Sequence, residues 1–145
     1  MTKILVIHGA GIDMRGKTQV DIFGSSTMED YNNEIIKYAE QLECKVDIFH
    51  SNIEGEIINK IYEAHNNNYD AAIINPAGFS IGYLALCAAI SQVEYPTVEV
   101  HISNPASRGQ FSDIATVCKG SITGLGLPGY YVAMKSIIDF NTSGT

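Results

Sequence analysis

Two residues that can exchange protons, Glu99 and His101, stand two positions apart in the stretch V-E-V-H-I-S-N (98–104). Residues two apart on a β-strand face the same side, so a strand here would bring the carboxylate beside the imidazole. A carboxylate on one ring nitrogen fixes the tautomer and leaves the other nitrogen free for general acid–base chemistry. The competing interpretation is a strand-end histidine that forms a hydrogen bond and has no further task.

The glycine-rich segment G-A-G-I-D-M-R-G (9–16) suggests a second chemistry, because such a loop after a strand can hold phosphate. Met14 stands where the third glycine of a dinucleotide loop belongs, and no helix follows directly to place its N-terminus against a pyrophosphate. The histidines at 8, 50 and 101 lack the spacing of a metal-ligand pair. The sequence therefore predicts no cofactor and no metal.

A chain that alternates between strand and helix patterns must position these residues. We predict strands at 3–8, 45–50, 71–75, 97–103 and 120–126, and helices that begin near 26, 51, 83, 106 and 128. Capping boxes are expected at Ser26–Glu29 and Ser51–Glu54. This alternation is typical of an α/β fold in which helices cover both faces of a five-stranded parallel sheet, a three-layer sandwich.

Polar residues cluster at the expected carboxyl ends of the strands. These ends carry His8, His50–Asn52, Asn75–Gly78 and His101–Ser103. Ligands of open α/β sheets bind beyond the carboxyl ends of the strands, so the fold itself predicts a site there.

Composition limits the other possibilities. The 145 residues predict a single domain over 1–145, with a frayed tail at about 141–145. A net charge of −7 argues against nucleic acid or an anionic membrane as a partner, and no apolar run is long enough to cross a bilayer. The sequence predicts no signal peptide. Its three cysteines are far apart and form no paired motif, which predicts free thiols and therefore a cytoplasmic protein.

Taken together, the motifs resemble those of the type II 3-dehydroquinate dehydratases, or type II dehydroquinases, over nearly the whole chain. The shared stretches are I-L-V-I-x-G at the first strand, S-N-x-E-G-E (51–56), I-I-N-P-x-G (73–78), V-E-V-H-I-S-N (98–104), Arg108 with Phe111, and G-x-I-x-G-x-G (120–126). The resemblance implies a flavodoxin-like fold, a lid loop over about 9–25, and a homo-oligomer, either a trimer or a dodecamer built from trimers.

The resemblance also assigns roles to residues. In the family reaction a tyrosinate on the lid removes a proton beside a ketone, and a histidine protonates the departing hydroxyl. His101 matches that acid, and Glu99 matches the carboxylate that orients it. Other matched or neighbouring positions are expected to bind the substrate and its carboxylate: Asn75, Ile102, Ser103, Arg108, Gly78, Ile81 and Phe23.

The residues that supply the general base in the family are replaced in this sequence. Phe23 stands where the family has its catalytic tyrosine, and Thr18 where it has the arginine that lowers the tyrosine pKa. Further family residues are replaced by Gly11, Ile81, Ser112 and Ala88. These losses predict little or no 3-dehydroquinate dehydration.

We therefore expect a repurposed lyase or isomerase that acts on a small carboxylate-bearing molecule through Glu99 and His101, with His8 or Asp13 as a catalytic partner. His8 has a plainer alternative role as a strand-end hydrogen-bonding residue. Asp13 has one as a solvated loop charge. The same two alternatives, a polar group of the pocket or a solvated loop charge, stay open for Arg15 and Lys17 on the lid. One alternative function is a non-catalytic family member that binds a metabolite or serves as an oligomeric scaffold. Another is a residual 3-dehydroquinate dehydratase that uses a different base.

Overall fold

The computed structural model describes residues 1–144 and is built on a five-stranded parallel sheet. The strands run in the order β2-β1-β3-β4-β5. Their bounds are Lys3–Ala10 (β1), Lys45–His50 (β2), Ala71–Ala77 (β3), Thr97–His101 (β4) and Gly120–Thr123 (β5). This is the flavodoxin-like order, with its switch point between β1 and β3, so the predicted α/β class is confirmed.

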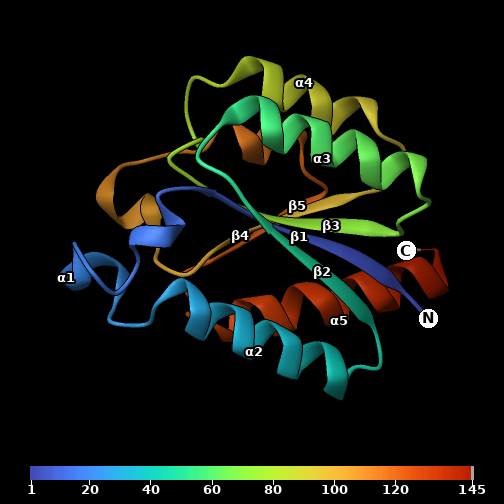
Figure 1. Cartoon of the computed structure of the whole chain (residues 1–145), viewed down its shortest axis with the longest axis horizontal. Helices are drawn as coiled ribbons and strands as arrows, with labels where there is room; N and C mark the ends of the chain where they lie inside the picture. The colour runs from blue at the N-terminus through green and yellow to red at the C-terminus, as the bar shows by residue number, and fades with distance from the viewer. Residues whose placement is uncertain (145) are drawn as a thin grey trace.

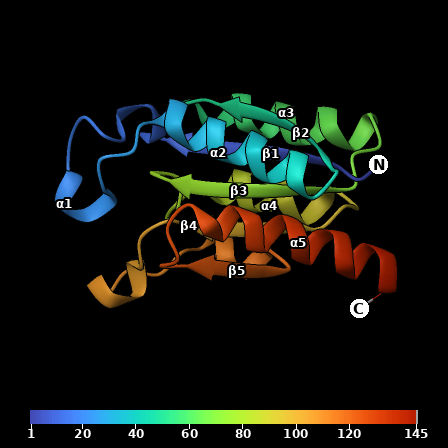
Figure 2. The same cartoon turned by 90° about the horizontal axis from the view of Figure 1, so that it is seen from below.

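Helices cover both faces of the sheet (Figure 1). On one face lie α3 (Glu54–Asn66) and α4 (Leu84–Gln92), and on the other lie α2 (Met28–Gln41) and α5 (Pro128–Ser143). Figure 2 shows the same layers from below, with the short helix α1 (Val20–Phe23) standing away from the sheet. No helix among residues 1–144 is both long enough and apolar enough to cross a membrane.

The central strand β1 explains why two helix layers form. Ile4 and Val6 pack into the core on the α2–α5 side, whereas Leu5 and Ile7 pack into the core on the α3–α4 side. All four side chains are buried, as expected of a parallel strand that is covered on both faces. At the carboxyl end, His8 pairs in register with His50 of β2 and with Asn75 of β3, which places three polar residues side by side.

The backbones of β1 and β3 approach closely just past this point. A Cβ atom at Gly9 would lie 2.0 Å from the carbonyl oxygen of Pro76, closer than any real contact. Glycine is therefore required at residue 9, and the Gly9 segment serves the packing of two strands.

The first predicted capping box is displaced by one residue, and the second is absent. The box at the start of α2 is formed by Thr27 and Asp30: the Thr27 Oγ1 accepts from the Asp30 N–H at 3.2 Å, and Asp30 accepts from the Thr27 N–H at 2.9 Å. The α3 helix has no such box, because its N-cap is Ile53. Ser51 instead accepts a hydrogen bond from the Ile53 N–H at 2.9 Å and donates to Glu56, which closes the turn before the helix.

Other boundaries also differ from the prediction. The 9–25 segment contains a 3₁₀ turn, η1 (Ile12–Met14), as well as α1, and β4 and β5 end earlier than expected. The helix that was expected to begin near 106 is only a 3₁₀ turn, η2 (Pro105–Arg108), and a second 3₁₀ turn, η3 (Ile114–Val117), follows it. The predicted frayed tail is mostly helical, since α5 runs to Ser143 and ends at Gly144 with φ 74°; residue 145 lies outside the described residues.

Candidate active site

A cavity of about 540 Å³ opens beyond the carboxyl ends of β1, β3 and β4. Its walls come from those strand ends, from the 9–25 segment and from the chain that follows β4. The predicted site residues that line it are Phe23, Asn75, Gly78, Ile81, His101, Ile102, Ser103 and Arg108. The fold thus gathers the expected polar groups at one place, at the switch point of the sheet.

Glu99 and His101 form the predicted pair. The His101 Nε2 lies 3.0 Å from the Glu99 Oε2, and the two side chains project from the same face of β4. His101 reaches the cavity wall, whereas Glu99 is 1% exposed and stands behind it. With Nε2 turned to the carboxylate, Nδ1 is the ring nitrogen left to exchange a proton with a ligand.

The Glu99 carboxylate is held by two serine hydroxyls as well. Ser112 donates to Oε2 at 2.5 Å, and Ser121, which is its register partner on β5, donates to Oε1 at 2.8 Å. Burial alone would raise the pKa of Glu99, but the hydrogen bonds from His101, Ser112 and Ser121 and the charge of His101 together lower it. Glu99 therefore stays ionised and orients the imidazole.

The expected carboxylate-binding residues surround His101. The Asn75 side-chain amide donates to the hydroxyl of the buried Tyr130 at 3.2 Å, which fixes the amide against the cavity wall. Arg108 donates through Nη2 to the Ser103 Oγ at 3.3 Å. Amide, hydroxyl and guanidinium donors thus converge beside the Glu99–His101 pair, and such donors suit an anionic ligand.

Phe23 lines the cavity from α1 and makes contact with two arginines. The central carbon of the Arg15 guanidinium lies 3.7 Å from the centre of its ring, and that of Arg108 lies 5.7 Å from it. The Phe23 ring is therefore a platform for cations. It has no atom that can accept a proton.

His8 does not reach the cavity, because the alternation of β1 sends its side chain the same way as Ile4 and Val6, into the α2–α5 layer. Its ring is fully buried, its Nε2 lies 2.7 Å from the Asn32 Oδ1, and it packs edge-on to Tyr31 and Tyr130. Burial, with a smaller contribution from the charge of His50, lowers the pKa of His8 to about 4 despite the bond to Asn32. The structure thus gives His8 a packing role.

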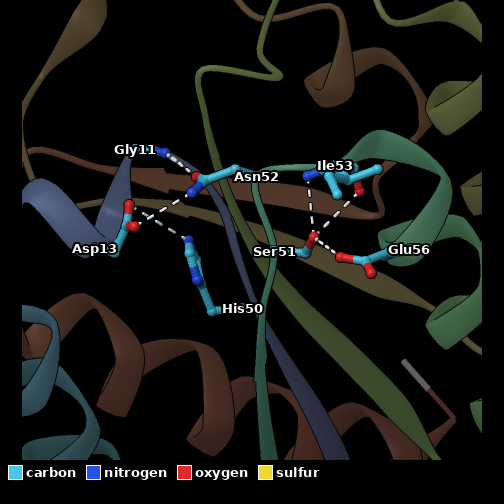
Figure 3. A network of polar contacts seen from close by, with 7 residues as sticks. All are labelled: Gly11, Asp13, His50, Ser51, Asn52, Ile53 and Glu56. Atoms are coloured by element: carbon cyan, nitrogen blue, oxygen red, sulfur yellow. Dashed lines mark hydrogen bonds and ion pairs between the residues drawn. The ribbon is translucent and has the colours of Figure 1, made fainter.

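Asp13 does not line the cavity, and its carboxylate faces His50 and Asn52 at the end of β2 (Figure 3). Its Oδ2 accepts a hydrogen bond from the Asn52 side-chain amide at 3.2 Å, and its Oδ1 lies 3.7 Å from the His50 Nε2. The Asn52 Oδ1 in turn accepts from the Gly11 N–H at 2.9 Å. This group fastens η1 to the β2–α3 turn, so Asp13, whose side chain is 40% exposed, is a partnered loop residue that is not placed to act with His101.

Comparison with known proteins identifies the family. Residues 2–138 match the model of the family described as dehydroquinase class II. This chain belongs to the type II dehydroquinase family. The curated protein "3-dehydroquinate dehydratase" of Caldanaerobacter subterraneus subsp. tengcongensis is 44% identical to this family member, over 94% of each chain. The protein of the same name from Halothermothrix orenii is 42% identical, over 100% of this chain and 99% of its own length.

Solved structures agree with this dehydroquinase-family assignment. The crystal structure of the type II dehydroquinase from Butyrivibrio crossotus matches with a TM-score of 0.90 at 35% identity, over 94% of this chain and 97% of that one. A 3-dehydroquinate dehydratase-like protein from Bifidobacterium longum matches with a TM-score of 0.76 at 26% identity, over 98% and 99%.

Sequence reasoning missed two contributions to this dehydroquinase-family site, from Tyr130 and Ser121, and left Arg15 open between a pocket residue and a solvated loop charge. Arg15 lines the cavity although a lone arginine in a loop has no periodicity to reveal its direction. Tyr130 supports Asn75 from across 55 positions of sequence, and Ser121 supports Glu99 through strand register. Register could have been derived for Ser121 had the bounds of β5 been known. Among residues 1–144, no group of three or more His, Cys, Asp or Glu side chains is arranged to hold a metal ion.

Proposed function

We propose that this chain is an enzyme of lyase or isomerase type that moves a proton on a small carboxylate-bearing substrate, with His101 as its acid and base. One observation supports this most directly. Of the side chains that line the cavity within the described chain, His101 alone carries an imidazole, the group best suited both to accept and to donate a proton in general acid–base catalysis. Arginine side chains and serine and threonine hydroxyls are poor proton carriers by comparison.

The reaction that we propose uses His101 as the group that carries the proton. The neutral His101 imidazole takes a proton from a carbon next to a carbonyl group, and the electron pair of that C–H bond forms an enolate. The imidazolium, stabilised by Glu99, then returns the proton. Delivery to a departing hydroxyl releases water and leaves a C=C bond, whereas delivery to a neighbouring carbon gives an isomer. Asn75, Ser103 and Arg108 would hold the substrate carboxylate.

Dehydration of 3-dehydroquinate itself is expected to be slow, although the curated relatives carry the name 3-dehydroquinate dehydratase. Phe23 keeps the aromatic ring but removes the only titratable atom at that position. A positioned general base typically contributes about 10²–10⁴-fold in rate, and its loss should lower turnover by that amount.

The second candidate function is a residual 3-dehydroquinate dehydratase, favoured by 44% identity to a protein of that name and by the intact Glu99–His101 pair. It would need a different base. Neither His8 nor Tyr83 lines the cavity, and the Tyr83 ring packs edge-on to Phe79 at 4.9 Å between centroids. This candidate therefore stands second.

The first experiment offers 3-dehydroquinate to the purified wild type and follows the absorbance of the conjugated enone product. Phe23→Tyr, which restores the missing hydroxyl, and His101→Gln are run beside it. His65→Gln, a change at a histidine on α3, is the matched control. We expect weak turnover by the wild type and none by His101→Gln. Fast wild-type turnover that His101→Gln abolishes would favour the residual dehydratase.

The second experiment offers a panel of small hydroxy- and keto-carboxylates and follows their conversion by NMR. We expect a substrate whose conversion His101→Gln abolishes and Glu99→Gln reduces, while His65→Gln leaves the rate unchanged. If His101→Gln altered neither conversion of any compound nor its affinity, the enzyme proposal would fail and a non-catalytic scaffold would be the better account.

A further inference from the structure

Two arginine side chains share the wall of the cavity in a chain whose net charge is −7. Arg15 comes from the 9–25 segment and Arg108 from η2, the turn after β4. Their guanidinium carbons lie 3.7 Å and 5.7 Å from the centre of the Phe23 ring. The fold therefore brings two like charges together at one aromatic ring.

Neither guanidinium is neutralised by a carboxylate in the part of the chain that the structure describes. The ion pairs there involve His50, Lys60, His101 and Lys135, and no Asp or Glu lines the cavity. Burial lowers the pKa of Arg15, and the nearby charge of Arg108 acts in the same direction. An uncompensated charge in a partly buried site costs free energy that a bound anion can offset.

Arg15 donates a hydrogen bond to the Tyr31 hydroxyl, and the stacking leaves its remaining N–H donors available for such an anion. A guanidinium over a ring uses its flat face, and its N–H groups point outward within its own plane. That geometry matches the two oxygens of a carboxylate or phosphate. A single acidic group would neutralise one of the two charges, and a cavity of about 540 Å³ has room for more than one such group.

We propose that the ligand of this cavity carries two acidic groups, one bound by Arg15 and the other by Arg108 with Ser103 and Asn75. This inference rests on the proposed function, because it names the substrate class of the same site. That class is a small dicarboxylate, or a carboxylate that also bears a phosphate or phosphonate. Phe23 supplies an apolar surface for the carbon chain between the two groups.

The test compares matched pairs of probes by isothermal titration calorimetry at about 0.15 M salt, where exposed charges are largely screened. Succinate is paired with butyrate, glutarate with valerate and adipate with hexanoate, so that each pair differs by one carboxylate. The compound 3-phosphonopropionate tests whether a phosphonate is preferred as the second group. We expect at least one dianion to bind about ten-fold more tightly than its monoanion.

Variants assign the second acidic group to Arg15. Arg15→Gln should remove the ten-fold preference while monocarboxylate affinity changes by less than about two-fold, and Arg15→Lys should keep part of the preference. Lys17→Gln, a change to an exposed cation of the same segment that does not line the cavity, should leave the preference intact. Thermal unfolding of each variant confirms that it is folded.

The outcomes separate this inference from the function on which it rests. Equal affinities within every pair, with carboxylates still binding, would overturn the two-anion inference and leave the proposed function standing. A preference that survives Arg15→Gln, or that Lys17→Gln also removes, would overturn it too. If no probe bound at all, both the inference and the small-carboxylate proposal would be contradicted.

Discussion

The buried ring of His8 ties the stability of the fold to pH. Burial lowers its pKa from 6.5 to about 4. Between these two values the unfolded chain binds a proton at His8 and the folded chain does not, so acidification favours unfolding. At one pKa unit per 1.36 kcal/mol, the full loss is about 3 kcal/mol, and it is complete once the pH falls below about 4.

We therefore predict that wild type loses about 3 kcal/mol more free energy of unfolding between pH 7 and pH 4 than His8→Gln does. The glutamine can still hydrogen-bond Asn32 but has no proton to gain. Urea unfolding at a series of pH values measures the difference, with His65→Gln as the control that should follow the wild type. Parallel curves for wild type and His8→Gln would show that His8 titrates normally in the folded protein.

At the scale of elements, the 9–25 segment depends on Asn52 for its anchorage. This side chain bonds both the Gly11 amide and Asp13, from the turn between β2 and α3 (Figure 3). Ile12 of η1 is fully buried in the core, so one apolar side chain holds this end of the segment together with Asn52.

We predict that Asn52→Ala speeds hydrogen exchange of the Gly11 amide by about ten-fold and lowers global stability by no more than about 1 kcal/mol, the value of one ordinary hydrogen bond. Amide exchange read by NMR gives both numbers. Asn33→Ala, a change at an exposed position of α2, is the control and should alter neither. Unchanged exchange at Gly11 in Asn52→Ala would mean that the anchorage lies elsewhere.

Local sequence patterns predict some of these side-chain positions and not others. Strand alternation was enough to predict the Glu99–His101 pair, because both residues lie on one strand. The same alternation places the His8 side chain on the side of Ile4 and Val6, away from the site. The prediction that His8 is catalytic rested on its position at the end of a strand, and it is wrong. The Thr27–Asp30 box differs by one residue from the prediction, since Asp at the third helical position caps as well as Glu. Arg15 depends on the folded course of a loop, which no local pattern encodes.

For the whole molecule, exposed apolar side chains at the carboxyl edge favour the predicted homo-oligomer. Leu84 is 75% exposed and Phe111 is 76% exposed, and Ile53 and Ile81 are also exposed. Ile53 is the N-cap of α3 and Leu84 is the first residue of α4, and Glu54 joins these neighbouring helices by accepting from the Leu86 N–H at 3.3 Å. Large apolar residues grouped in this way usually mark contact with another chain.

We predict that sedimentation finds a homo-oligomer and that Leu84→Glu shifts it towards smaller species, because a buried charge without a partner opposes association. Ile36→Glu, a change to an exposed apolar residue on α2, should leave the sedimentation coefficient unchanged. A wild type that sediments as a monomer at all concentrations would contradict the prediction.

A single imidazole as proton carrier also constrains the stereochemistry of the reaction. Proton removal and proton return would both take place on the face of the ligand that meets His101, which makes the transfer suprafacial. The His101 side chain is only 9% exposed, which would slow the exchange of its captured proton with water. An isomerisation run in heavy water should give product that partly keeps the hydrogen that the substrate brought with it, whereas a site with a separate acid and base would deliver deuterium.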